Sequence, residues 1–139
     1  MVPCLADMIK DHSLDFVCIQ DTHKRDFKKC FLRRIDCHDI FEWDWIPSIG
    51  RSGGMLCGVK KNKFDLVSCV KRKYSMQMNL FDTSINVFWS LCCVYGAAHE
   101  EDKQEFLVEL VDMCSHIPTP YIVGGDFNII RHYGDKNKN

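Results

Sequence analysis

The residues best suited to chemistry lie near the end of the sequence, in the segment Ile-Val-Gly-Gly-Asp-Phe-Asn at residues 122–128. A short apolar strand that stops at two glycines presents the residues after it at its carboxyl end. Side chains two positions apart in an extended chain point the same way, so Asp126 and Asn128 can converge on one site while Phe127 turns into the core. A carboxylate can hold a metal ion or orient water, and an amide can donate to a phosphate oxygen without adding repulsive charge. The segment therefore suits phosphate chemistry, although it also fits a tight turn in which Asp126 bonds its own backbone.

Two further strand ends carry side chains that could reach the same site. Asp21 follows the apolar run at residues 14–20, and two acids at strand ends can meet over one cation. Tyr95 closes the apolar segment at residues 85–95, and its phenol could donate a hydrogen bond to a phosphoryl oxygen. Taken alone, Asp21 fits an exposed strand end or a helix cap, and Tyr95 fits a packing residue. Together the three strand ends indicate one phosphate site.

The hydrophobic pattern predicts the elements that position these residues. Strands are expected at residues 14–20, 55–59, 64–70, 74–80, 85–95 and, as a short buried strand, 121–123. Helices are expected near residues 2–9, as a short basic helix or turn over 27–35, and from Glu100 onward, while 43–54 reads as a loop. The last helix should bury Phe106, Leu107, Leu110, Val111 and Cys114 on one face. Hairpins mixed with flanking helices predict a layered α/β architecture.

Composition narrows the class of protein. With 46% hydrophobic and 12% aromatic residues the chain can build a packed core. The apolar runs are too short to cross a bilayer and no signal segment opens the sequence, so we expect an intracellular protein that is neither membrane-bound nor secreted. The net charge of −1 creates no global attraction for polyanions, so nucleic-acid contact would come from the basic clusters at residues 24–34 and 60–73, which also fit solvated faces.

The nine cysteines do not indicate a disulfide scaffold, because their number is odd and there is no secretory signal. Five of them lie inside apolar runs and read as small buried hydrophobes, namely Cys18, Cys57, Cys69, Cys92 and Cys93. A zinc site would need paired ligands at metal spacing, and the nearest candidate is Cys30, Cys37 and His38. We therefore do not predict a zinc site from the sequence.

The three strand ends resemble the endonuclease/exonuclease/phosphatase superfamily. Gly-Gly-Asp-Phe-Asn at 124–128 matches its central motif, Phe-Val-Cys-Ile-Gln-Asp-Thr at 16–22 resembles its Gln-Glu-Thr motif, and Val-Tyr-Gly at 94–96 resembles its Tyr-x-Pro strand end. The segments at 50–59 and 129–131 resemble the apurinic-type endonuclease of plant-type LINE (non-LTR) retrotransposons in particular. The resemblance runs over nearly the whole chain.

This resemblance implies a fold and a mechanism. The fold would be a DNase I-like four-layer α/β sandwich, two packed mixed β-sheets flanked by helices. The reaction would be phosphodiester hydrolysis by water, with Mg²⁺ or Mn²⁺ as the ion and no small-molecule cofactor. By position, Asp126 would orient or deprotonate the water, Asn128 and Tyr95 would bind the scissile phosphate, and Asp21 would ligate the metal. DNA would be the substrate, and the location would then be nuclear.

The chain also departs from the family pattern. The family has glutamate where this chain has Asp21, and the shorter side chain withdraws the carboxylate by more than about 1 Å, which weakens magnesium binding. The family places an asparagine on an earlier strand, and a further acid and a Ser-Asp-His segment later. We therefore expect residues 1–139 to be a partial domain, incomplete at both ends, with little or no turnover. Unpaired sheet edges would favour self-association.

Three functional hypotheses follow. The first is a DNA-nicking endonuclease of a LINE-type retroelement, present as a weak or inactive fragment. The second is a non-enzymatic retroelement remnant with at most weak nucleic-acid contact through residues 60–73. The third is a phosphatase of the same superfamily, which would share the core carboxylates.

Overall fold

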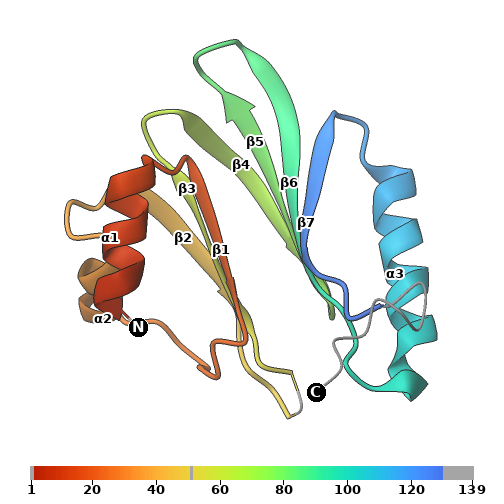
Figure 1. Cartoon of the computed structure of the whole chain (residues 1–139). Coiled ribbons are helices and arrows are strands. Elements are labelled where there is room, and N and C mark those ends of the chain that lie inside the picture. Colours follow the sequence, from red (N-terminus) through yellow and green to blue (C-terminus); the bar gives the residue numbers. More distant parts are fainter. Residues whose placement is uncertain (1, 51, 130–139) are drawn as a thin grey trace.

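Two β-sheets pack against each other in the computed structural model, which describes residues 2–50 and 52–129 (Figure 1). The first sheet is antiparallel, in the order β1 (Phe16–Gln20), β3 (Met55–Lys60), β2 (Phe41–Ile46). The second has the order β4 (Phe64–Lys71), β5 (Ser75–Asp82), β6 (Val87–Tyr95), β7 (Tyr121–Asp126), and only the β6–β7 pair is parallel. Residues 130–131, His132 and the tail at 135–139 lie outside the described residues.

Helices cover the outer face of each sheet, which makes four layers. The helices α1 (Val2–His12) and α2 (Lys29–Ile35) lie against the first sheet, and the short η1 (Glu100–Asp102) leads into α3 (Lys103–His116) on the second (Figure 1). This arrangement confirms the predicted DNase I-like sandwich. No helix among the described residues is long and apolar enough to cross a membrane.

The interior between the sheets follows from the alternation of side chains along the strands. On β3, Met55, Cys57 and Val59 face the second sheet, while Leu56 packs under the helices. On the second sheet, Met76, Met78, Leu80 and Leu91 are among the residues that complete this core. Each fully buried side chain of this size stabilises the fold by roughly 1.5–3 kcal/mol relative to exposure.

The predicted loop over residues 43–54 is wrong in its first part. Trp43, Trp45 and Ile46 belong to β2, because alternating aromatic residues pair along β3, with Trp43 opposite Gly58. A Cβ on Gly58 would lie 2.6 Å from the Trp43 ring, so the missing side chain makes room for the indole. Only the later glycine-rich part, where Gly54 has φ +75°, is a loop.

Burial differs from the predictions at the sheet edges and on α3. The strand β7 was expected to be buried, yet it is an edge strand with Tyr121 41% and Ile122 51% exposed. On α3 the buried positions are Phe106 and Met113, and Leu110 and Cys114 flank them. The predicted stripe was rotated too far, because Leu107 and Val111 lie outside it and are exposed. Phe127 does pack toward this core, with its ring centroid 6.5 Å from that of Phe106.

Candidate active site

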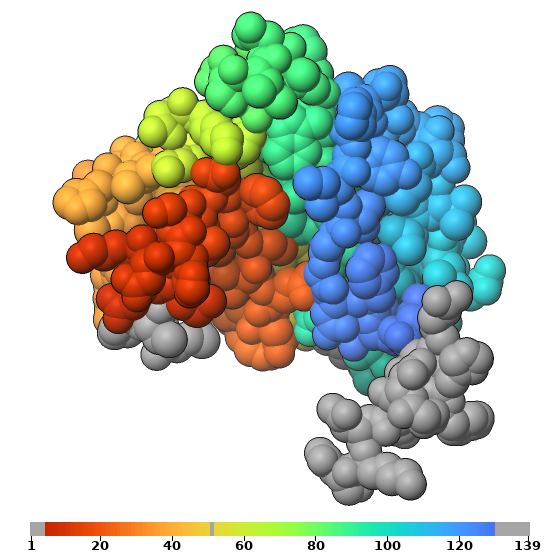
Figure 2. Space-filling model, turned by 45° about the horizontal axis from the view of Figure 1, so that its top comes forward, coloured from red at the N-terminus to blue at the C-terminus, as the bar shows by residue number. Residues whose placement is uncertain are grey.

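The three strand ends singled out in the sequence meet at one edge of the sandwich. The strands β6 and β7 run parallel, so their carboxyl ends share an edge, and Tyr95 lies directly opposite Asp126. The end of β1 reaches the same place from the other sheet, because the Asp126 N–H donates to Gln20 Oε1 at 3.1 Å. Figure 2 shows the N-terminal part in red and orange beside β7 in blue on one face of the molecule. Asp21, Tyr95 and Asp126 therefore surround one site.

Gln20 connects the two sheets at this point. Its side-chain Nε2 donates to the carbonyl oxygen of Val94 on β6, while its Oε1 accepts the Asp126 N–H from β7. Both polar atoms of one amide are thus used to hold the ends of β1, β6 and β7 together. Gln20 was not among the predicted site residues, although it stands next to Asp21 in the segment that resembles the family motif.

The two glycines before Asp126 have different roles. Gly125 has φ +140°, and a Cβ there would lie 2.0 Å from Val94 O and 2.5 Å from Gln20 Nε2. A Cβ on Gly124 would meet nothing within 4 Å. Of these two positions, only 125 requires glycine, because a side chain there would collide with Val94 O and with the Gln20 amide.

Asp126 and Asn128 are brought together by a turn rather than by an extended strand. The strand ends at Asp126, and Asn128 adopts a left-handed backbone with φ +51°. Its N–H donates to Asp126 Oδ1 at 2.9 Å, and its side-chain Nδ2 donates to Gly96 O at 2.9 Å. The turn alternative considered for the sequence is therefore what the backbone adopts, and Asp126 stays exposed next to Asn128. The second carboxylate oxygen of Asp126, Oδ2, and the second hydrogen of Asn128 Nδ2 take no part in these hydrogen bonds.

Asp21 brings a second carboxylate to Tyr95. Its backbone is left-handed, with φ +56°, and its N–H donates to Gly54 O at 3.0 Å. A Cβ on Gly53 would lie 2.0 Å from Asp21 Oδ1, so the carboxylate rests directly over a glycine backbone. Its Oδ1 is also 3.1 Å from His23 Nε2. His23 is thus a partner of the predicted metal ligand.

Burial and the two carboxylates oppose ionisation of the Tyr95 phenol. Burial, then the charge of Asp21 and a hydrogen bond with it, and finally the charge of Asp126, raise the pKa of the Tyr95 phenol. A neutral phenol retains the proton with which it can donate to a phosphoryl oxygen. Within the described part of the chain, neither carboxylate forms an ion pair with a lysine or arginine.

The donor set fits a hydrated magnesium ion. Mg²⁺ prefers oxygen ligands and is usually held by one or two carboxylates, with water and substrate phosphate completing its shell. Asp21 and Asp126 are two exposed carboxylates that both act on the Tyr95 phenol at one edge of the sandwich. The sequence-based roles of metal ligand for Asp21 and water-orienting group for Asp126 are compatible with this placement.

Comparisons with known proteins give one consistent result. The model of the endonuclease/exonuclease/phosphatase family matches residues 3–138. Similar solved structures include the human nocturnin catalytic domain with bound sulfate, at 16% identity and a TM-score of 0.67. Others are the 2′,3′-cyclic phosphatase ANGEL2 with adenosine-2′,3′-vanadate, at 15% and 0.68, and a mannosyl-6-phosphatase of Bacteroides thetaiotaomicron, at 14% and 0.66.

The alignments cover 93%, 93% and 92% of this chain but 57%, 44% and 56% of those proteins, respectively. The chain therefore spans less than two thirds of their length. At these identities the likeness establishes the fold. No curated protein matches the sequence.

Proposed function

Because the chain belongs to the endonuclease/exonuclease/phosphatase family, we propose that it hydrolyses phosphodiesters with a divalent ion, and that its substrate is DNA. The observation that carries the proposal is that Tyr95 meets Asp126, its partner across the β6–β7 pair, and that the carboxylate of Asp21 acts on the same phenol. Three strands far apart in sequence place these groups at one edge. Packing alone does not require carboxylates there.

Each residue has a role that its surroundings support. Asp126 orients the attacking water through the carboxylate oxygen that does not accept the Asn128 N–H. Tyr95 and Asn128 donate to the phosphate oxygens, since one is held neutral and the other keeps a free amide hydrogen. Asp21 and Asp126 would hold Mg²⁺ or Mn²⁺, which would stabilise the charge that develops on the phosphate and leaving group.

A polyanionic substrate is favoured by one of the two basic clusters. Lysines of the cluster at 60–73 are paired with carboxylates, in the pairs Lys61–Asp39, Lys63–Asp15, Lys71–Asp44 and Lys73–Glu105. These pairs reduce the attraction of that surface for phosphate. The cluster at 24–34 begins three residues after Asp21, and Lys24, Arg25 and Lys28 are exposed there. We propose that DNA approaches along this second cluster, next to the site.

The finer assignment is to LINE-type endonucleases. It rests on the resemblance at 50–59, whose Gly53 gives the Asp21 carboxylate its place over the backbone. The alternative is a phosphatase, which is the activity named for ANGEL2 and for the Bacteroides protein. Both activities need the same carboxylates, so the substrate distinguishes them.

Turnover should be slow. Asp21 reaches less far than the glutamate of the family, and His23 already contacts its Oδ1 at 3.1 Å. Magnesium requires short and nearly octahedral ligand geometry, so a retracted and already paired carboxylate weakens its binding.

The test is nicking of supercoiled plasmid by the purified chain with Mg²⁺ or Mn²⁺, beside hydrolysis of p-nitrophenyl phosphate. We expect metal-dependent nicking that Asp126→Ala abolishes and that Asp112→Ala, an exposed acid on α3, leaves unchanged. Faster release of p-nitrophenol than nicking would favour the phosphatase alternative. A folded chain without either activity, at any tested metal concentration, would support the non-enzymatic alternative and overturn the proposal.

A gain-of-function variant sharpens this test. Asp21→Glu restores the reach of the family carboxylate, so we expect nicking at a lower Mg²⁺ concentration than in the unchanged chain. The matched control is Asp112→Glu, which adds the same methylene to α3. If Asp21→Glu does not change the metal dependence of a measurable activity, Asp21 is not a metal ligand.

A further inference from the structure

A group of three thiols lies between the sheets, outside the proposed active site. The sulfur atoms of Cys18 on β1, Cys57 on β3 and Cys93 on β6 all lie within 4.8 Å of one another. Cys57 Sγ is 3.3 Å from Cys18 Sγ. Cys57 and Cys93 are 0% and 2% exposed, whereas Cys18 is on an exposed edge strand. The group therefore has two buried members and a third member on an edge strand of the first sheet.

The register of the first sheet explains why two of the thiols meet. Cys18 lies directly opposite Cys57 in the antiparallel pair of β1 with β3. Hydrogen-bonded and non-hydrogen-bonded pairs alternate along an antiparallel ladder. Asp15 with Lys60, and Asp21 with Gly54, are hydrogen-bonded pairs, and each lies an odd number of positions from Cys18 and Cys57. Cys18 and Cys57 are thus a non-hydrogen-bonded pair, in which the side chains approach most closely. The third thiol reaches them from the facing sheet.

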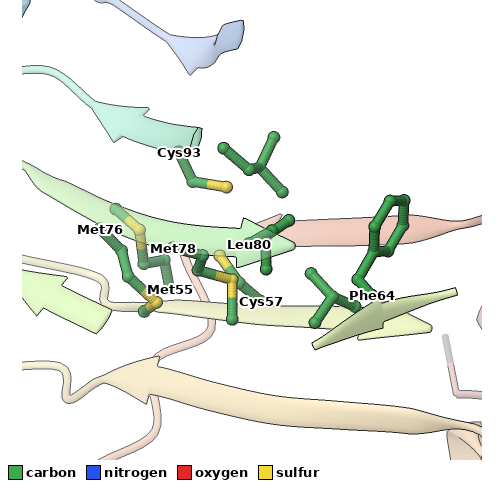
Figure 3. Packing of buried hydrophobic residues seen from close by; sticks show 9 residues of the cluster. Met55, Cys57, Phe64, Met76, Met78, Leu80 and Cys93 are labelled. Carbon is green, nitrogen blue, oxygen red and sulfur yellow. The ribbon is translucent and has the colours of Figure 1, made fainter. Parts of the chain in front are cut away.

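The surroundings of these thiols are rich in sulfur. Met55, Met76 and Met78 belong to the same core cluster as Cys57 and Cys93. Figure 3 shows Cys93 directed into this interior, toward the strands that carry these methionines. The group itself contains three cysteines and no histidine, aspartate or glutamate. Such a donor set selects soft or borderline ions rather than Mg²⁺.

We propose that Cys18, Cys57 and Cys93 form a three-thiolate zinc site, with solvent as the fourth ligand on the Cys18 side. A tetrahedral ion with Zn–S bonds of about 2.3 Å holds its sulfur ligands about 3.8 Å apart. The thiols are already close to this arrangement, because Cys18 Sγ and Cys57 Sγ are 3.3 Å apart and all three sulfur atoms lie within 4.8 Å of one another. Three thiolates and a divalent ion leave one negative charge, whereas a monovalent ion would leave two, and buried charge is costly. Binding replaces the three thiol protons, which are released to solvent.

The thiols also differ in their readiness to ionise. Hydrogen bonds from Cys57, and then from Cys93, lower the pKa of the Cys18 thiol. Hydrogen bonds with the same neighbours and burial raise the pKa of Cys57.

This site differs from the zinc candidate considered in the sequence. Among the described residues, Cys18, Cys57 and Cys93 form the group of three ligand-type side chains whose donor atoms meet, and Cys30, Cys37 and His38 do not form one. The three thiols come from strands separated by 39 and 36 positions, so no local spacing reveals them. Only the packing of the two sheets brings them together.

The experiment is an anaerobic titration of the reduced chain with Co²⁺, a spectroscopic substitute for Zn²⁺. The reference chain carries Cys30→Ser and Cys37→Ser, which remove two exposed thiols outside the group. We expect one Co²⁺ per chain, thiolate-to-cobalt charge-transfer absorption from three sulfur ligands, and displacement by Zn²⁺. Cys18→Ser should weaken binding by about 100-fold or more, while Cys92→Ser, a buried thiol in the other core cluster, should not.

The outcomes are decisive because Cys18 is exposed, so its replacement tests the ligand set without opening the core. Circular dichroism confirms that each variant is folded, and Asp126→Ala must retain Co²⁺ binding, since the proposed site is separate from the carboxylates. No charge-transfer band in the reduced chain overturns the proposal. So does binding that survives Cys18→Ser, or a Cys18–Cys57 disulfide that persists under the reducing conditions.

Discussion

Replacing Gln20 with methionine should destabilise the fold and the position of Asp126. Methionine has a similar volume but can neither donate to Val94 O nor accept from the Asp126 N–H. Each net hydrogen bond contributes about 0.5–1.5 kcal/mol, and a buried group left without a partner costs about 1–3 kcal/mol. Val94 is fully buried, whereas water can reach the exposed Asp126. We therefore expect a loss of about 2–3 kcal/mol in the free energy of unfolding.

Urea denaturation followed by tryptophan fluorescence measures this loss. The midpoint should fall by about 1–2 M with little change in the slope. The matched control is Gln104→Met on the exposed face of α3, which should stay within about 0.5 kcal/mol of the unchanged chain. In the plasmid assay, the folded Gln20→Met protein should nick about 10- to 100-fold more slowly, because the backbone of Asp126 is no longer fixed.

Two results would refute this reasoning. Equal stability of the Gln20→Met and Gln104→Met chains would show that the inter-sheet bridge adds nothing to folding. A destabilised but fully active Gln20→Met chain would show that Gln20 holds the sheets together without positioning Asp126. The second result would leave the fold argument intact and remove only its connection to catalysis.

Three further predictions concern the backbone, the phenol and the surface. Gly125→Ala should destabilise the chain and lower activity more than Gly124→Ala, because only the former places a Cβ against Val94 O, as paired urea titrations would show. The Tyr95 phenol should titrate above its ordinary pKa of about 10. The contribution of the protonated phenol to the free energy of unfolding is present below that pH and is lost as pH rises through the raised pKa. Asp21→Asn should lower the pH midpoint of tyrosinate absorbance relative to that of the unchanged chain. Light scattering should detect self-association that Ile122→Lys on the edge strand β7 reduces, and a monomer at every concentration would contradict this prediction.

The strand ends were predictable because their signals are local. The apolar runs before Asp21, at Tyr95 and before Asp126 each identify a strand without knowledge of the rest of the fold. The end of the last strand was wrong, because β7 continues through the two glycines to Asp126 instead of stopping at Val123. The parallel pairing of β6 and β7 then brings two of these ends together. The strand β2 was missed because Pro47 and the glycines after it extended the loop signal over Trp43 and Trp45, whose alternation with Phe41 was the contrary evidence.

Contacts between distant segments could not be predicted in the same way. The Gln20 amide meets the Asp126 backbone across 106 positions, and nothing in the residues between them specifies that pairing. The Cys93 thiol likewise reaches Cys18 only because the two sheets pack face to face. Such contacts depend on how two sheets are placed relative to each other, which hydrophobic periodicity within each strand leaves open.

The backbone conformation at position 21 gives a structural reason for aspartate where the family has glutamate. Aspartate is among the few residues that adopt a left-handed backbone readily, since its short side chain can bond locally, and Asp21 has φ +56°. A glutamate there would gain reach toward the metal but would strain the backbone by up to about 1–2 kcal/mol. Asp21→Glu should therefore improve metal dependence while lowering stability. If Asp21→Glu improved both metal dependence and stability, the backbone at position 21 would have left the left-handed region to accommodate the longer side chain. The left-handed conformation would then depend on the aspartate itself.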